Sequence, residues 1–178
     1  LMPKFEVVVA TQDWHPPEHG SFHTQHEDAE PYQMGELGGE PQIMWPEHCV
    51  RGTRGAEFID EIKDEYFQAI IRKGLDPDVD SYSTFYDNFH LNPSGLRGYL
   101  EERGVGVIFL AGLAFDFCVR YSALDALEFT PEVYVIEDAT RGVEEDSIRE
   151  TREIFRKKGV RLIRSDRVDD ILESLRVG

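Results

Sequence analysis

Cysteine is scarce in this chain of 178 residues, which contains only Cys49 and Cys118. Two cysteines cannot form a disulfide framework, and free thiols are typical of proteins in a reducing compartment. No uninterrupted apolar run reaches the ~18 residues that a membrane-spanning helix needs. Residues 1–4 also lack the charged start and the apolar stretch of a signal peptide. We therefore expect a soluble, cytoplasmic protein.

Basic residues are few as well, with 19 lysines and arginines against 35 acidic residues and a formal net charge of −16. A surface so acidic repels phosphate backbones and anionic lipid heads, which argues against partners of either kind. The chain is long enough to bury a core, and 40% of its residues are hydrophobic. No internal repeat or change of composition divides it, so we expect a single domain over residues 1–178.

Short apolar runs alternate with amphipathic segments along the chain. The runs predict strands at residues 5–10, 69–71, 106–112, 132–136 and 160–163. The strongest of them do not alternate apolar with polar residues, which is typical of parallel strands covered on both faces. Helical spacing predicts helices from a Ser94 cap to Gly104, after Cys118, over residues 148–155 and over residues 168–175. This order predicts a three-layer α/β/α sandwich with a mostly parallel sheet. The polar stretch 23–44 predicts a long surface loop.

Metal-ligand residue types gather after the first expected strand. Asp13 and His15 stand two apart just past its end, where the carboxyl edge of a parallel sheet places ligand sites. Carboxylate and imidazole groups suit a borderline divalent ion. His48 is the leading candidate for a third ligand, and His19, His23 and His26 crowd the same region. The alternative is that these are surface histidines in a polar loop.

Cys118 follows the strongest expected strand at the start of a helix. The positive end of a helix dipole favours the thiolate, and backbone N–H groups of the same turn could face a developing oxyanion. The alternative is a buried structural cysteine, which is what Cys49 is expected to be. Lys73 ends another expected strand and should reach the same edge, where a cation lowers a thiol's pKa. Its alternative is a solvated surface charge.

Several ordered blocks together carry a family resemblance. They are residues 10–16 (ATQDWHP), 19–22 (HGSF), 45–50 (WPEHCV), 55–58 (GAEF), 82–85 (YSTF) and 112–126, which span the Cys118 turn and the following SALDA. Over nearly all of its length the chain resembles the nicotinamidase branch of the isochorismatase-like cysteine hydrolases. The resemblance implies hydrolysis of nicotinamide to nicotinate and ammonia in NAD salvage, often with pyrazinamide as a second substrate.

The resemblance also implies roles for individual residues. Cys118 would be the nucleophile that forms a thioester, and Lys73 would hold its partner acid. A cis peptide would join Leu113 to Ala114, and the N–H groups of Ala114 and Cys118 would form the oxyanion hole. The implied metal ligands are Asp13, His15 and His48, with His19 as a fourth ligand in some members, for zinc, iron or manganese. The implied substrate contacts are Trp45, Leu113, Ala114, Tyr82 and Phe85. Members are often dimers or larger oligomers.

One part of the family pattern is missing. The family's acid lies on a first, central strand with the pattern Asp-x-Gln-x-Asp-Phe, and no such segment occurs in these 178 residues. Asp13 is assigned to the metal and Asp116 to the nucleophile turn. We therefore expect that this strand and its helix were cut away or lie on a separate segment. Two alternatives stay open: a related amidohydrolase for another small amide, and an inactive metal-binding homologue that lacks the acid.

Overall fold

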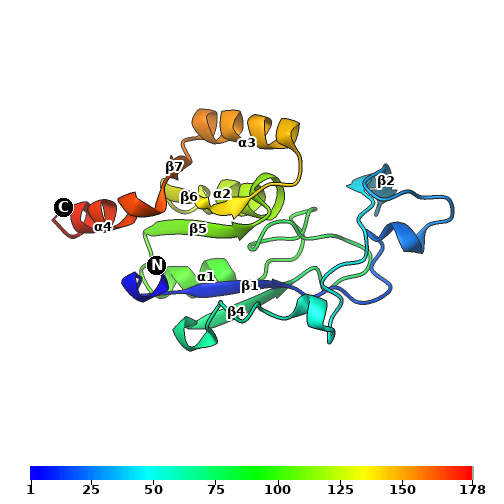
Figure 1. Cartoon of the computed structure of the whole chain (residues 1–178), viewed down its shortest axis with the longest axis horizontal. Coiled ribbons are helices and arrows are strands. Elements are labelled where there is room, and N and C mark those ends of the chain that lie inside the picture. The colour runs from blue at the N-terminus through cyan, green and yellow to red at the C-terminus, as the bar shows by residue number, and fades with distance from the viewer. Residues whose placement is uncertain (178) are drawn as a thin grey trace. The chain divides into compact units, whose positions relative to one another are not determined.

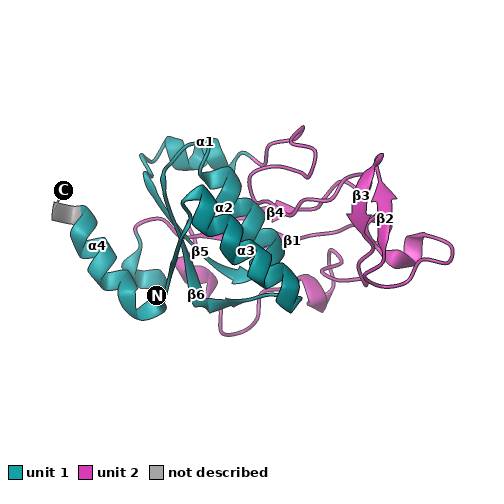
Figure 2. Ribbon diagram, turned by 90° about the horizontal axis from the view of Figure 1, so that it is seen from above, with its two compact units in different colours: residues 1–5, 95–178 teal, residues 6–94 magenta. Residues whose placement is uncertain are grey.

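The computed structural model describes residues 1–177 and contains two compact units. Unit 1 is formed by Leu1–Phe5 together with the chain from Gly95 onward, and unit 2 is formed by Glu6–Ser94 (Figure 2). Within the described residues, no helix is both long enough and apolar enough to cross a membrane. Because each unit is described by itself, the expectations of a single domain and of three layers stay predictions.

A parallel sheet of three strands forms the centre of unit 1. Its order is β5 (Val107–Leu113), β6 (Glu132–Arg141) and β7 (Arg161–Ile163) (Figure 1). The expected strands at 106–112, 132–136 and 160–163 are thus confirmed. Val133 and Val135 of β6 are fully buried, as the unbroken apolar run requires. The β5–β6 register shifts between Leu110 and Gly112, just before the chain leaves the sheet.

Helices connect these strands in the right order for parallel pairing. The helices of unit 1 are α1 (Leu96–Glu101), α2 (Arg120–Ala126), α3 (Glu145–Lys158) and α4 (Val168–Val177). Of these, α2 connects β5 to β6 and α3 connects β6 to β7. Figure 2 shows α2 and α3 side by side, and they contact each other. The buried Phe155 of α3 meets Phe115 edge to face, with ring centroids 5.5 Å apart. Ser94 does not cap α1 as expected. Gly95 occupies the cap position with φ +87°, and no side chain caps the helix. The Ser94 amide donates to the Phe85 carbonyl.

Unit 2 contains a parallel strand pair and a hairpin. The pair joins β1 (Val9–Asp13) to β4 (Ala69–Lys73), and the hairpin joins β2 (Met34–Leu37) to β3 (Glu40–Ile43). The long surface loop expected at 23–44 therefore contains a hairpin. Gly38 and Gly39 both have positive φ and form the tight turn that closes the hairpin. The fold is α/β with parallel sheets, as the sequence predicts.

The first strand begins and ends later than its apolar run suggests. Phe5 follows a single 3-10 turn at Met2–Lys4, and pairing starts only where Val9 lies opposite Ala69. The strand continues to Asp13, which is therefore its last residue and does not lie beyond its end. Among the described strands, β1 pairs with β4 alone and β5 pairs with β6 alone. The family's central first strand, which we expect to have been cut away or to lie on a separate segment, stays a prediction.

Candidate functional site

The β1–β4 register brings Asp13 and Lys73 side by side at the carboxyl ends of both strands. The two residues are Cα partners, and Lys73 Nζ lies 2.6 Å from Asp13 Oδ1. Lys73 is 6% exposed, so the alternative of a solvated surface lysine was wrong. Burial raises the pKa of the Asp13 carboxyl, but the Lys73 ammonium outweighs it, and the pKa lies below its usual value. Asp13 is therefore ionised at neutral pH.

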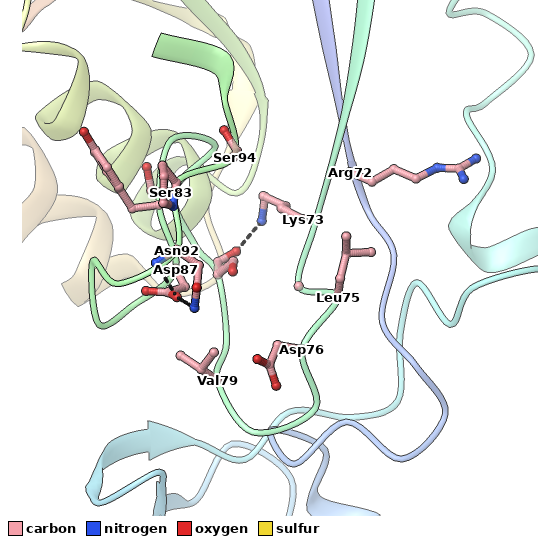
Figure 3. Close-up of a pocket in the computed structure, with 13 residues that line it drawn as sticks. Arg72, Lys73, Leu75, Asp76, Val79, Ser83, Asp87, Asn92 and Ser94 are labelled. Atoms are coloured by element: carbon pink, nitrogen blue, oxygen red, sulfur yellow. Dashed lines mark hydrogen bonds between the residues drawn. The ribbon is translucent and has the colours of Figure 1, made fainter. Parts of the chain in front are cut away.

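Lys73 also lines a pocket within unit 2. Figure 3 shows Arg72 and Lys73 pointing to opposite sides of β4, as the alternation of a strand requires. Lys73 Nζ donates to the Ser81 carbonyl at 2.7 Å, across the hollow from β4. Asp87 holds the far wall in place by accepting hydrogen bonds from the amides of Leu91 and Asn92. The ammonium is thus fixed in position by two oxygen partners.

The ring of His15 is held by the turn after β4. His15 Nδ1 lies 2.9 Å from the Gly74 carbonyl and donates to it, which leaves Nε2 as the free lone pair. Gly74 has φ +64°, and a Cβ there would collide with the His15 ring. Glycine is therefore required at this position. Burial lowers the pKa of His15 to about 4, so the ring is neutral at pH 7 and can bind a metal.

The segment that carries His48 is attached to the backbone of His15. The His15 amide donates to Cys49 O, and the Arg51 amide donates to His15 O. The ring centroids of His15 and His48 lie 4.9 Å apart, and His48 Nδ1 donates to the Pro46 carbonyl at 2.8 Å. His48 therefore also presents Nε2.

The structure brings together the three metal-ligand candidates expected from the sequence. Ligand atoms of Asp13, His15 and His48 all lie within 4.8 Å of one another. The fully buried Phe22 packs against the rings of His15 and His48, with ring centroids 5.6 and 5.5 Å apart, and gives the cluster an apolar neighbour. One carboxylate and two neutral imidazoles are a donor set that suits a borderline divalent metal.

His19 lies in the same cluster, with its ring 4.4 Å from that of His15. It is fully buried, its Nδ1 is bonded to Ser21, and its Nε2 has no hydrogen-bond partner among the described residues. A buried polar atom without a partner is costly and points to something that the residues alone do not supply. His23 and His26 take no part in this cluster, since the ring of His26 is bonded to the Gly20 carbonyl.

Trp45 and Tyr82 form a partly exposed aromatic corner beside His48. Trp45 Nε1 donates to the Tyr82 hydroxyl at 3.1 Å, and the Trp45 ring lies 6.3 Å from the ring of His48. Phe85 is 3% exposed and is part of the core of unit 2.

Cys118 lies in unit 1, on a single π-helical turn at Phe115–Val119 that joins β5 to α2. The peptide between Leu113 and Ala114 is cis, as the resemblance implied. The amides of Phe117 and Val119 both donate to the Ala114 carbonyl and close the turn. Cys118 forms no disulfide and is half-buried, and the turn presents it at the carboxyl end of β5.

Asp116 fixes this turn to the loop that follows β6. Its carboxylate is 1% exposed and accepts hydrogen bonds from the amides of Val143 and Glu144 at 3.0–3.2 Å. A Cβ on Gly142 would collide with Ile148, so glycine allows the close approach. Asp116 is therefore occupied by the turn, as expected.

Comparison with known proteins decides the family. A family model described as the isochorismatase domain matches residues 8–167. The chain belongs to the isochorismatase family. A nicotinamidase of Escherichia coli is 44% identical over 138 residues, which are 78% of this chain and 64% of the relative. The chain thus spans slightly less than two thirds of that curated relative's length.

Solved structures of the isochorismatase family agree with the fold. A nicotinamidase and pyrazinamidase structure from Acinetobacter baumanii has a TM-score of 0.89 at 41% identity, covering 93% of this chain and 80% of its own. A pyrazinamidase of Pyrococcus horikoshii in complex with zinc has a TM-score of 0.71 at 33% identity, covering 91% and 77%. The donor set around His15 and this similarity together indicate a divalent metal.

Two residues of this isochorismatase-family site were missed by the sequence analysis. Gly74 supports His15, and its signal was a glycine directly after the strand that ends at Lys73. Asp80 lies with His15 and His19 in a second cluster of candidate ligands, and its signal was an acid two residues before the Tyr82 block. Neither signal is specific without the fold.

Proposed function

We propose that this protein is a cysteine-dependent amide hydrolase that converts nicotinamide to nicotinate and ammonia in the cytoplasm, as a step of NAD salvage. Pyrazinamide is proposed as a second substrate. The observation that carries this proposal is the set of Asp13, His15 and His48, held beside the buried Lys73 at the carboxyl ends of β1 and β4. The nicotinamidase names of the relatives support it.

Cys118 is proposed as the nucleophile. An amide is a poor electrophile, and a thiolate replaces one difficult hydrolysis by two easier steps. The Cys118 sulfur attacks the carboxamide carbon, and the N–H groups of Ala114 and Cys118 donate to the oxyanion. Collapse of this adduct breaks the C–N bond and leaves a thioester. The thiol proton leaves with the nitrogen as ammonia, and water then hydrolyses the thioester to the carboxylate.

Asp13, His15 and His48 would hold the divalent metal, and zinc is the proposed ion. When bound, such an ion supplies a Lewis-acid contact for the pyridine nitrogen of the substrate. Trp45 and Tyr82 would form the aromatic wall that a flat ring requires, and Leu113, Ala114 and Phe85 complete the proposed substrate contacts. His19 would be a further ligand.

The acid that moves the thiol proton is proposed to come from outside these 178 residues. Within the described chain, Asp13 is bound to Lys73 and Asp116 is bound to backbone amides. Neither is available as a proton carrier, because the oxygens of both are already engaged as acceptors. Lys73, which is fixed by Asp13 and Ser81, would then also orient the supplied acid.

The direct test is ammonia release from nicotinamide by the zinc-loaded protein. Cys118→Ala should reduce the rate by about 10³-fold or more, because it removes the nucleophile. Cys49→Ala, which changes the other cysteine of the chain, should keep the wild-type rate. Equal rates for the two variants, or no ammonia from zinc-loaded wild type supplied with the missing segment, would overturn the proposal. In the second case metal binding without turnover would indicate the inactive homologue.

A further inference from the structure

Asp80 is a buried carboxylate for which neither the sequence nor the proposed reaction provides a role. It is 4% exposed, in the loop that follows β4. Its oxygens accept from the Ser81 amide at 2.7 Å and from Gln42 Nε2 at 3.1 Å. Both donors are neutral, and Lys73, the buried ammonium of unit 2, is bound to Asp13. A buried carboxylate stabilised only by neutral donors favours a cation beside it.

Two buried imidazoles lie on the other side of this carboxylate. Ligand atoms of Asp80, His15 and His19 lie within 4.8 Å of one another. The Nδ1 atoms of both rings are occupied, that of His15 by Gly74 and that of His19 by Ser21. His15 therefore offers Nε2. In the tautomer that carries its proton on Nδ1, His19 donates to Ser21 Oγ at 2.8 Å and offers Nε2, which has no hydrogen-bond partner among the described residues. This orphaned nitrogen is independent evidence for a ligand in the cluster.

Charge strengthens the same conclusion. In the set of Asp13, His15 and His48, the only negative charge is already balanced by the Lys73 ammonium at 2.6 Å. Among the described residues, the Asp80 carboxylate has no ammonium group as near as Lys73 is to Asp13.

We propose that Asp80 is a direct ligand of the divalent cation, in a second ligand set with His15 and His19. The proposal rests on the metal centre of the proposed function and extends it by one residue. His15 belongs to both sets and offers one free lone pair, so a single ion is bound per chain.

The test is zinc affinity measured on the whole protein by competition with a chromophoric chelator. Asp80→Asn should weaken zinc binding by about 100-fold or more, since even residues that only support ligands contribute 10–100-fold. Wild type should bind one zinc per chain. Two control variants isolate the carboxylate: Gln42→Met removes its side-chain hydrogen-bond donor, and Asp78→Asn removes an exposed negative charge two residues away. Both should bind zinc as wild type does.

A merely structural role for Asp80 gives a different result. Gln42→Met would then weaken zinc binding as much as Asp80→Asn does, or Asp80→Asn would bind zinc with wild-type affinity. Either outcome overturns the proposal. The visible absorption of the cobalt-substituted protein is a second readout, because its d–d bands should change in Asp80→Asn and not in the controls.

Should Asp80→Asn fail to fold, Asp80→Glu keeps a carboxylate and shifts it by one methylene. We expect this variant to bind cobalt with altered d–d bands, and an unaltered spectrum would overturn the proposal. Failure of the proposed function is distinguishable. Zinc-loaded wild type that releases no ammonia when it is supplied with the missing segment contradicts the hydrolase, whereas Asp80-dependent zinc affinity stands without any turnover.

Discussion

The Asp13 carboxylate and the Lys73 ammonium stabilise each other at a place where neither would be stable alone. Lys73 is almost fully buried, and its second partner is a backbone carbonyl. Removing one member of a buried pair leaves the other charge without compensation, which costs more than the pair itself contributes. This pair therefore fixes the end of β1, from which the chain continues to His15.

Lys73→Met tests the strength of this pair. The variant should unfold with a free energy about 3 kcal/mol lower than wild type at pH 7, measured by urea titration. The neighbouring Arg72→Met, which changes an exposed side chain of the same strand, should cost much less.

The loss of unfolding free energy in Lys73→Met should also depend on pH. The folded-state pKa of Asp13 lies below its ordinary value, so the stability that its ionised form contributes is present above about pH 4 and is lost as the pH falls further. In Lys73→Met the lowering partner is gone and burial raises the pKa of Asp13, which permits its protonation. The difference between wild type and variant should therefore narrow from pH 7 to pH 3. A constant difference would contradict the assigned ion pair.

Sequence reasoning at the residue scale identified side chains by type and spacing. Asp13 and His15 stand two apart in an extended segment, and His48 completes the set through a backbone bridge between residue 15 and residue 50. Asp80 was not predicted, because its place beside His15 depends on the loop after β4 and on no local spacing.

At the scale of elements, the π turn after β5 is the structure that presents Cys118. Its geometry depends on a carboxylate inside the turn and on a loop about 27 residues further along the chain, because Asp116 accepts from the amides of Val143 and Glu144. Two backbone donors of the β6–α3 connection thus have their partner in a different element. The turn cannot shift without leaving them unsatisfied.

Asp116→Ala should therefore lower the free energy of unfolding by about 2–4 kcal/mol, since it removes a buried side chain that accepts from the amides of Val143 and Glu144. Asp116→Asn keeps one acceptor oxygen and should lose less. Asp146→Ala, on the exposed face of α3, should change stability by about 0.5 kcal/mol or less. Urea unfolding of the three variants at pH 7 measures the order, and an Asp116→Ala protein as stable as Asp146→Ala would contradict the role of the carboxylate.

Elements with strong apolar runs were predictable from the sequence, and those fixed by tertiary contacts were not. Val133 and Val135 mark β6 without any knowledge of the fold. The start of β1 follows from its partner at Ala69, and the hairpin at Gly38 from two positive φ angles in a stretch that is polar throughout. In both cases the deciding interaction is pairing between segments, which the periodicity of one segment does not encode.

At the scale of the whole molecule, the chain carries a net charge of −16, and the acidic field raises the local concentration of cations. Such a field favours a divalent ion at the buried histidines and disfavours nucleic acid, as the composition predicts. Cys118 belongs to unit 1, and the proposed metal ligands belong to unit 2. The family, with its relatives named as nicotinamidases, was predictable because several sequence blocks occur in the expected order.

The most direct test of the central claim is an acyl group trapped on Cys118 during turnover. The zinc-loaded protein, supplied with the segment that carries the proposed acid, is mixed with nicotinamide, quenched in acid, digested and analysed by mass spectrometry. The account predicts a nicotinoyl thioester on the peptide that contains Cys118, absent from the Cys49 peptide and removed by hydroxylamine. Ammonia released without any such adduct, and released equally by Cys118→Ala, would contradict it.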